Sequence, residues 1–350
     1  MASARSRHSV GRVAHSSRHD SRVKSVLSTA VAVVMMSACS ASGPTNAPAM
    51  DAASTAPATG TAWPSVSTAA GVITIGAEDL PSVTPASDPL VADAPARIAA
   101  LAIGVGETIE ALGAGPRVVA RDEASSGQFI DAAPVVTKGH ALSAERVLAT
   151  QSDLAIVDAS TSPPEAIDQL RAAGVRVVEV PQAWSVSDMP ARIRAVGAAV
   201  GASPSAITGL IARLDSASPP VSGPRPKVAF LYLRGSSAIY LLGGRGSGAD
   251  DLIERAGGVD VGAGAGLAAF TPLTAEALAA ADPEILLVMS EGLSSVGGIE
   301  GLREIPGVAQ TSAGREGSVV VVDDTVLLSF GPRTPALIER LAAAFRHVAG

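Results

Sequence analysis

The chain has only two tyrosines, Tyr232 and Tyr240, and they lie close together in the sequence. Tyr232 ends an apolar, strand-like run, and Arg234 follows two positions later, so both side chains are expected on one face of a strand. A guanidinium beside a phenol favours the phenolate, the form that binds ferric iron. The alternative is a tyrosine at the edge of the core beside a solvated arginine.

Histidine offers a second ligand type. Of the five histidines, three lie within the first 20 residues, and His347 lies at the end of a predicted C-terminal helix, where a cation favours the helix dipole. His140 lies in a loop ahead of a predicted helix. Ligands of open α/β sheets bind in such loops, at the carboxyl ends of the strands. From its position alone, His140 is either a ligand-binding side chain or simply an exposed one.

The N-terminal 39 residues have the pattern of an exported lipoprotein. Six Lys and Arg residues precede an apolar run over 25–38, which is shorter than the ~20 residues needed to span a bilayer. Cys39 is the only cysteine, and Met36-Ser-Ala-Cys39 resembles the bacterial lipobox, in which the cysteine is acylated. We predict a signal peptide over 1–38 and lipidation of Cys39. The alternative is an ordinary signal peptide with an unrelated cysteine.

The charge that remains after such processing is strongly negative. Removing residues 1–38 takes six of 26 basic residues and one of 33 acidic residues, which leaves 20 against 32, a net charge of −12. Nucleic acid is therefore excluded as a partner, because it requires a basic face. Residues 40–70 are rich in Ala, Ser, Thr and Pro and poor in large apolar side chains. We expect residues 39–70 to comprise the lipidated cysteine and a flexible stalk.

From residue 97 onward, short β-branched runs alternate with helical stretches, which is typical of an α/β fold with a parallel sheet. The predicted strands are residues 98–103, 117–121, 153–157, 175–180, 227–233, 238–242, 284–289 and 318–322. The predicted helices are residues 107–112, 143–149, 164–173, 248–256, 274–281, 298–305 and 334–349.

The segment 185–218 interrupts this alternation, because its apolar residues recur at helical spacing and no strand separates them. Pro204 either starts a second helix or kinks a long one. We predict two Rossmann-like α/β lobes, residues 71–184 and 219–350, joined by one long backbone α-helix over 185–218. A ligand is expected in the cleft between the lobes. A single large doubly wound domain is the alternative.

Several segments resemble the heme-binding lipoproteins of bacterial heme ABC importers, of the actinobacterial type. In the C-terminal half these are residues 288–302, 306–311 and 327–334; in the first lobe they are Gly-His-Ala-Leu-Ser-Ala-Glu at 139–145 and residues 164–174. The resemblance extends over about residues 97–350. It implies the two-lobed fold with a helical backbone.

The resemblance also implies a ligand set for heme iron. His140 matches the position of a histidine from one lobe, and Tyr232 matches that of a tyrosine from the other, with Arg234 hydrogen-bonded to this tyrosine. Histidine and phenolate are both established axial heme ligands. Tyr240 is the alternative tyrosine ligand. Met289 matches a methionine near the heme.

Other residues are candidates to contact the heme or the transporter. Arg234 and Arg245 are candidates for the heme propionates, and Arg245 matches an arginine that Gram-negative relatives place near the iron ligand. The few rings available to pack on the porphyrin are Phe129, Phe270 and Phe330. Family members dock on the permease through an acid on each lobe, for which the candidates are Glu145 in the first lobe and Asp250 or Asp251 in the second. The alternative for all three acids is an ordinary charge at a helix N-terminus.

The sequence therefore predicts a lipid-anchored, monomeric substrate-binding protein on the extracytoplasmic face of the cell membrane. It would capture heme through His140 and Tyr232 and deliver it to an ABC permease and its ATPase, with no catalysis and no other metal. A ferric-siderophore or corrinoid binder on the same fold is the alternative. A redox enzyme would need an open iron position, and an adhesion lipoprotein would bind no small ligand.

Overall fold

The computed structural model describes residues 68–69, 71–215 and 223–349. The predicted signal peptide, Cys39 and nearly all of the predicted stalk therefore lie outside the described residues. No helix within the described part of the chain is long and apolar enough to cross a bilayer.

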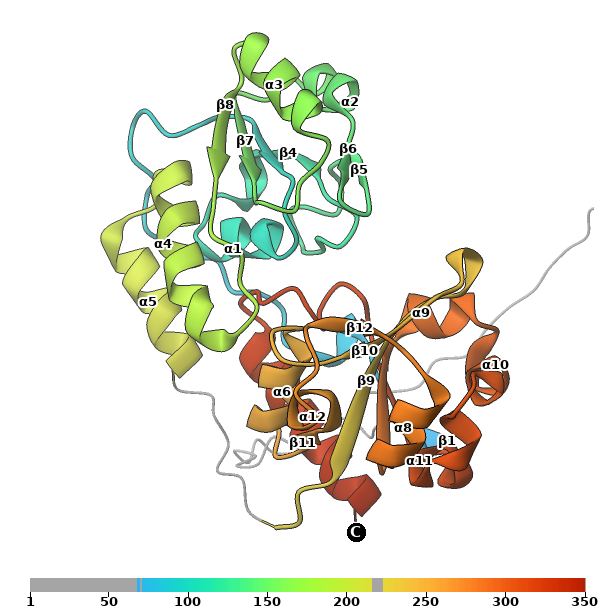
Figure 1. The fold of residues 1–350 in the computed structure, drawn as a ribbon. Helices are drawn as coiled ribbons and strands as arrows, with labels where there is room; N and C mark the ends of the chain where they lie inside the picture. Colours follow the sequence, from blue (N-terminus) through green and yellow to red (C-terminus); the bar gives the residue numbers. More distant parts are fainter. Residues whose placement is uncertain (1–67, 70, 216–222, 350) are drawn as a thin grey trace, which may run out of the picture. The chain divides into compact units, whose positions relative to one another are not determined.

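The first lobe is built on a four-stranded parallel sheet with the strand order β4-β3-β7-β8 (Figure 1). All residues of β3 and β7 are buried, which explains why these runs are continuously apolar instead of alternating. The strands are β3 (Ile98–Ala100), β4 (Val118–Arg121), β7 (Leu154–Val157) and β8 (Arg176–Glu179). The helices are α1 (Val105–Ala111), α2 (Ala144–Ala149) and α3 (Pro164–Ala172). A small hairpin of β5 (Thr137–Lys138) and β6 (Ala141–Leu142) precedes α2.

The second lobe contains a mixed sheet with the order β1-β2-β14-β13-β9-β10-β12, and β11 also pairs with β9. Its four central strands, β2, β14, β13 and β9, are parallel, whereas β10 and β12 continue the sheet in antiparallel fashion. The strands are β1 (Thr68–Ala69), β2 (Val72–Ile75), β9 (Lys227–Arg234), β10 (Ile239–Gly243), β11 (Val259–Asp260), β12 (Phe270–Pro272), β13 (Ile285–Met289) and β14 (Val319–Val322).

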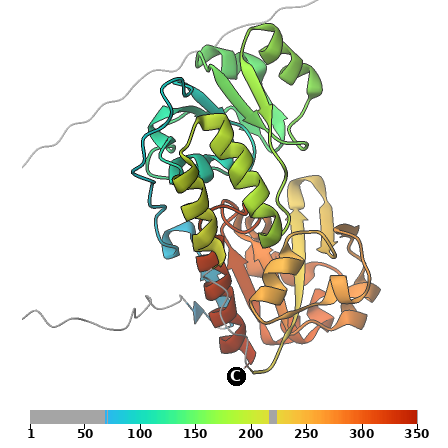
Figure 2. The same ribbon diagram turned by 90° about the vertical axis from the view of Figure 1, so that its left-hand side faces the viewer.

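The helices of the second lobe lie on both sides of this sheet (Figures 1 and 2). They are α6 (Ala249–Arg255), α7 (Val261–Gly264), α8 (Ala275–Ala281), α9 (Ser290–Ser295), α10 (Gly298–Glu304), α11 (Ser312–Glu316) and α12 (Thr334–Ala349). Short 3₁₀ helices occur at Ala77–Asp79, Gly115–Arg117, Val186–Asp188, Gly235–Ser237 and Val308–Gln310. The two-lobed α/β architecture expected from the sequence is confirmed.

One strand belongs to a different lobe from the one expected. Residues 71 onward were assigned to the first lobe, but β2 pairs in parallel with β14, from Val72 opposite Val319 to Ile75 opposite Val322. The chain thus starts its described part in the second sheet and then enters the first lobe at β3. A local sequence pattern predicts a strand but not its partner, because the pairing joins residues almost 250 positions apart.

The segment between the lobes forms two helices, α4 (Met189–Val200) and α5 (Pro204–Asp215), where a single long helix was expected. They pack side by side (Figure 2). Gly201 ends α4 in the left-handed conformation, with φ 73°, which is favourable only for glycine and a few other residues. Pro204 begins α5. Of the two possibilities at this proline, a second helix or a kink in one long helix, the structure therefore has the second helix.

The largest apolar core is shared by both lobes and by the helices that join them. It contains Ile98 and Ile109 from the first lobe, Val196 from α4, and Phe230 and Leu337 from the second lobe. Two smaller clusters fill the other faces of the two sheets. The lobes therefore do not have entirely separate hydrophobic interiors.

Two buried ion pairs also connect the lobes. Arg333, just before α12, pairs with Glu107 on α1 and donates to Ser126 Oγ at 3.0 Å. Arg192 on α4 pairs with Asp158, which follows β7, at 3.3 Å and donates to the Ser329 carbonyl of the second lobe at 3.2 Å. Burial raises the pKa of Glu107, and Arg333 opposes that shift. Glu107 is buried and its cation comes from the second lobe. The ion pair therefore favours the arrangement of the lobes in which these two charges meet.

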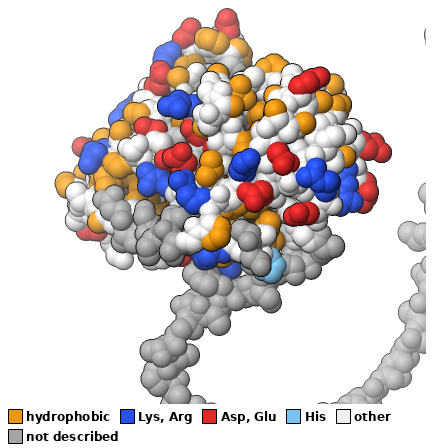
Figure 3. Space-filling view, turned by 60° about the horizontal axis from the view of Figure 1, so that its bottom comes forward, with side chains coloured by type: hydrophobic (Ala, Val, Ile, Leu, Met, Phe, Trp, Pro, Cys, Tyr) orange, Lys and Arg blue, Asp and Glu red, His pale blue; other side chains and the backbone are white. Residues whose placement is uncertain are grey.

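The lobes approach each other closely where α1 begins. Gly104 has φ 77°, and a Cβ at this position would collide with the Ser329 carbonyl oxygen. Glycine is therefore required here for both its conformation and its size. Away from this contact, basic and acidic side chains intermingle on the described surface that Figure 3 shows.

Candidate ligand-binding site

Tyr232 and Arg234 lie on one face of β9, as their spacing predicted. The Arg234 Cζ atom lies 4.6 Å from the centre of the Tyr232 ring, in the geometry of a cation–π contact. The guanidinium thus lies over the ring, and no hydrogen bond to the phenol oxygen is found among the described residues. Tyr232 is only partly buried and packs at the margin of the shared core.

Arg234 is positioned by groups on neighbouring elements. Its Nη1 atom lies 3.8 Å from Asp324 Oδ1 and donates to the Leu233 carbonyl at 3.1 Å. Asp324 in turn accepts hydrogen bonds from Ser290 Oγ at 2.9 Å and from the Glu291 backbone N–H at 2.8 Å. The carboxylate holds the guanidinium loosely, because the arginine side chain is 37% exposed and the ion pair is long. Arg234 therefore remains available to an anionic group of a ligand.

Tyr240 lies on the opposite face of the sheet from Tyr232. In the β9–β10 pair, Tyr240 is opposite Leu233 and Tyr232 is opposite Leu241. Directly opposed residues share a face, whereas adjacent residues on a strand alternate. Tyr240 accordingly packs on the outer apolar cluster with Leu233, while Tyr232 packs on the shared core. The two candidate tyrosines cannot serve the same ligand from these positions.

The face that carries Tyr232 also carries the predicted Met289 and Phe270. Phe270 on β12 contacts Tyr232 edge to face, with ring centres 5.6 Å apart. Met289 ends the adjacent strand β13, and the ladder with β9 places it on the Tyr232 side. Ile239 is opposite Arg234 and is 41% exposed. We call Tyr232, Arg234, Ile239, Phe270 and Met289 the tyrosine face.

Trp184 extends the tyrosine face, although the sequence analysis did not single it out. It lies between β8 and α4, and its ring centre is 6.4 Å from that of Phe270 in an edge-to-face contact. Its indole is 36% exposed. The one sequence feature that could have drawn attention to Trp184 is the rarity of its residue type, since the chain has only two tryptophans. By contrast, Phe330 is buried in the core.

His140 lies at the turn of the β5–β6 hairpin in the first lobe. Its side chain is exposed, and its carbonyl accepts hydrogen bonds from the Ser162 backbone N–H at 2.9 Å and from Ser162 Oγ at 3.2 Å. Gly139 precedes it with φ 58° and donates to Glu123 at 2.7 Å. The backbone of the turn is thus fixed. No hydrogen bond or ion pair joins the His140 ring to the tyrosine face among the described residues.

The remaining predicted residues, Arg245, Glu145 and Asp250, differ in their exposure and in their hydrogen bonds to the rest of the chain. Arg245 is exposed in the loop after β10 and forms no ion pair within the described chain, so it is accessible to an anion. Glu145 is exposed in the first turn of α2. Asp250 is half-buried and accepts hydrogen bonds from the backbone N–H groups of Gly246 at 2.8 Å and Gly248 at 3.0 Å. Asp250 therefore stabilises the loop that precedes α6.

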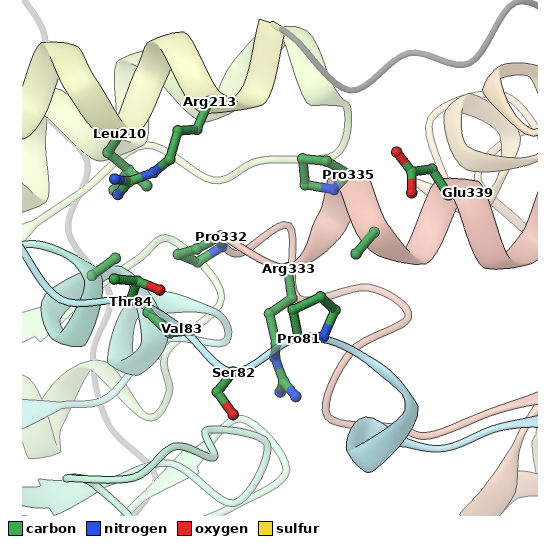
Figure 4. Close-up of a pocket in the computed structure, with 12 residues that line it drawn as sticks. Pro81, Ser82, Val83, Thr84, Leu210, Arg213, Pro332, Arg333, Pro335 and Glu339 are labelled. Carbon is green, nitrogen blue, oxygen red and sulfur yellow. The ribbon is translucent and has the colours of Figure 1, made fainter. Parts of the chain in front are cut away.

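A pocket of about 280 Å³ lies elsewhere, between α5, residues 81–84 and the start of α12 (Figure 4). Pro81, Pro332 and Pro335 line it, together with Arg333 and Arg213 from different elements. None of the predicted site residues lines it. It adjoins the Glu107–Arg333 contact, so it belongs to the junction of the lobes and not to the tyrosine face.

Comparisons with known proteins agree on the fold and on one ligand class. Residues 98–326 match the family described as periplasmic binding protein. The periplasmic heme-binding protein RhuT from Roseiflexus sp. RS-1, in apo form, is 36% identical, with a TM-score of 0.68; the match covers 73% of this chain and 99% of that chain. The heme-binding protein HmuT is 34% identical, with a TM-score of 0.71 and coverage of 79% and 97%.

A third similar structure is the periplasmic heme-binding protein BhuT in complex with two hemes, 32% identical with a TM-score of 0.64, covering 73% of this chain and 99% of that one. Structures of HmuT also include single alanine variants of a histidine, of a tyrosine, and of an arginine two positions after that tyrosine. The last two have the spacing of Tyr232 and Arg234. No curated protein sequence matches this chain.

Proposed function

Because this chain belongs to the periplasmic binding protein family, we propose that it binds heme outside the cytoplasm and delivers it to an ABC importer. The tyrosine face is the observation that carries the proposal. It combines a phenol, a cation and apolar side chains on one face of the second sheet, as a flat, dianionic iron porphyrin requires. Similarity to heme-binding proteins over almost their whole length supports it.

We propose Tyr232 as the iron ligand from the second lobe and His140 as the ligand from the first. Tyr232 is favoured over Tyr240, because only Tyr232 shares a face with Arg234 and Met289. Arg234 and Arg245 would neutralise the propionates. Both axial positions would then be filled, which leaves no open iron site for catalysis.

The same proposal assigns the parts of the chain. Residues 1–38 form the signal peptide, Cys39 carries the lipid, and residues 40–70 form a stalk that tethers a monomer to the extracytoplasmic face of the membrane. The lobes comprise residues 71–184 and 219–350, joined by 185–218, except that β2 completes the second sheet. Glu145 and Asp250 would contact the permease, whose ATPase drives transport.

Titration with hemin tests the proposal. The purified protein, Tyr232→Phe and Tyr240→Phe are each mixed with hemin, and the visible spectrum is recorded. We expect a sharp Soret band for the unaltered protein and for Tyr240→Phe, and a shifted, weaker band for Tyr232→Phe. If the unaltered protein gives no Soret change, heme is not the ligand, and ferric siderophores and corrinoids become the compounds to screen.

A further inference from the structure

Trp184 lies at the end of a row of three rings. Its ring centre is 6.4 Å from that of Phe270, with an interplanar angle of 71°, and Phe270 is 5.6 Å from Tyr232 at 68°. In such edge-to-face contacts, the ring that contributes its edge keeps both faces free of that partner. Trp184 is also among the few large apolar side chains that are substantially exposed. The row therefore has uncovered aromatic surface beside the proposed iron ligand.

The segment that carries Trp184 is attached to the second lobe, although it directly follows a strand of the first. The Val186 backbone N–H donates to Asp251 Oδ2 on α6 at 2.9 Å, and Arg255 holds the same carboxylate oxygen at 2.9 Å. The Trp184 backbone N–H donates to Asp188 at 3.1 Å. These hydrogen bonds fix the backbone at Trp184 relative to the second lobe, which contains Phe270 and Tyr232.

We propose that Trp184 is a further ligand-contacting residue, which packs on the porphyrin macrocycle and selects a flat aromatic ligand independently of its metal. This inference rests on the proposed heme-binding function. Burying an exposed indole against an apolar ring system is favourable, and ring-on-ring contact adds to the burial itself. Tyr232 would recognise the iron, whereas Trp184 and Phe270 would recognise the plane around it. A non-planar iron chelate would gain from the tyrosine but not from the indole.

Two ligands separate these roles: hemin, and protoporphyrin without iron. Each is titrated into the unaltered protein, Trp184→Leu, Trp184→Phe and Tyr232→Phe. Trp184→Leu keeps an apolar side chain but removes the aromatic plane, so we expect both ligands to bind about tenfold more weakly, with an unchanged Soret maximum for hemin. Trp184→Phe should recover most of the affinity. Tyr232→Phe should shift the hemin Soret band and leave protoporphyrin binding unchanged.

Val259→Ala is the control, because Val259 is similarly exposed, at 38%, but lies on β11 opposite Lys227, at the far end of β9 from Tyr232. It should bind both ligands as the unaltered protein does. If Trp184→Leu binds hemin and protoporphyrin as tightly as the unaltered protein does, this inference is overturned, but the proposed function is not. Failure of the unaltered protein to bind hemin overturns the proposed function, and this inference with it.

Discussion

The two lobes present their proposed iron ligands on different kinds of backbone. Tyr232 is on an eight-residue strand, paired on both sides, and its ring is held between Arg234 and Phe270. His140 is on a hairpin whose strands have two residues each, with its side chain exposed. A rigid strand fixes the direction of a side chain, whereas a hairpin turn fixes only its backbone. The second lobe is therefore the prearranged half of the proposed site.

The lobes also differ in the charges that they bring to their junction. Glu107 and Asp158 come from the first lobe, and their partners Arg333 and Arg192 come from the second lobe and from α4. The Glu107–Arg333 pair can therefore form only when the lobes are together, whereas Asp158 pairs with the helix that follows the first lobe.

The largest effect is expected where a charge at the junction loses its partner. Arg333→Leu should lower the free energy of unfolding by about 3–5 kcal/mol, because it leaves Glu107 buried without its cation. Arg171→Leu is the control: its pair with Asp168 is exposed, at 52% and 73%, and its loss should cost less than about 1 kcal/mol. Urea denaturation measures both. Similar small losses for the two variants would mean that the junction contributes no more than a surface pair.

Acid should stabilise the first lobe through Asp122. Burial raises the pKa of Asp122 from 3.8 to about 6, although Ser125 and the backbone N–H of Ala124 donate to it. Between about pH 4 and 6 the native state therefore holds a proton that the unfolded state has lost, and stability from this group falls as pH rises. In Asp122→Asn, the slope of unfolding free energy against pH should change by up to about 1.4 kcal/mol per pH unit in this window.

Asp260 provides the matching test in the second lobe, because burial also raises its pKa to about 6. Urea denaturation at several pH values compares Asp260→Asn and Asp122→Asn with the unaltered protein. Both variants should flatten the fall of stability between pH 4 and 6. A slope that stays unchanged in Asp122→Asn would show that this carboxyl titrates normally in the folded protein.

Loss of the cation beside the proposed ligand should weaken heme binding. Arg234→Gln removes the charge over Tyr232, and partners of metal ligands typically contribute about 10–100-fold to metal affinity. Arg245→Gln changes an exposed arginine that does not contact the tyrosine, so its effect should be smaller. Competitive hemin titration gives both affinities. If Arg245→Gln weakens hemin binding more than Arg234→Gln does, the arginine on the loop after β10 is the more important of the two for binding.

The smallest effect on affinity is expected for the hairpin ligand. His140→Ala should shift the Soret band because an axial ligand is lost, but it should weaken hemin binding only about three- to tenfold. The exposed ring has to be ordered when it binds, and that entropy offsets part of the bond. An unchanged spectrum would exclude His140 from the iron. A loss larger than that of Tyr232→Phe would reverse the ranking of the two lobes.

Strands and helices with strong local signals could be predicted from the sequence. The continuously apolar runs at β7 and β14 are buried at every position, and Pro164 starts α3 as its position indicated. The hairpin around His140 was missed, because two-residue strands have too few positions to show a period. The sequence leaves the break between α4 and α5 open at Pro204, since the flanking helices continue the same apolar spacing.

The candidate site was only partly predictable for a related reason. Spacing placed Tyr232 and Arg234 on one face, but the face of Tyr240 depends on the length of the β9–β10 turn. Arg234 pairs with Ile239, and this register sends Tyr240 to the other side. Trp184 has no local signal of a site residue, because Phe270, the ring that it contacts, is distant in sequence. Contacts of this kind are determined by the tertiary fold.

The division of acids and bases at the junction has a consequence for recombination between related genes. A chimera that takes its first lobe from this chain inherits Glu107 and Asp158, which need cations at the positions of Arg333 and Arg192 in the other parent. Chimeras between parents that lack these matching cations would contain buried acids without partners. The apolar core that the lobes share would also be poorly packed. New ligand preferences would then arise more readily by altering surface side chains such as Trp184 than by exchanging lobes.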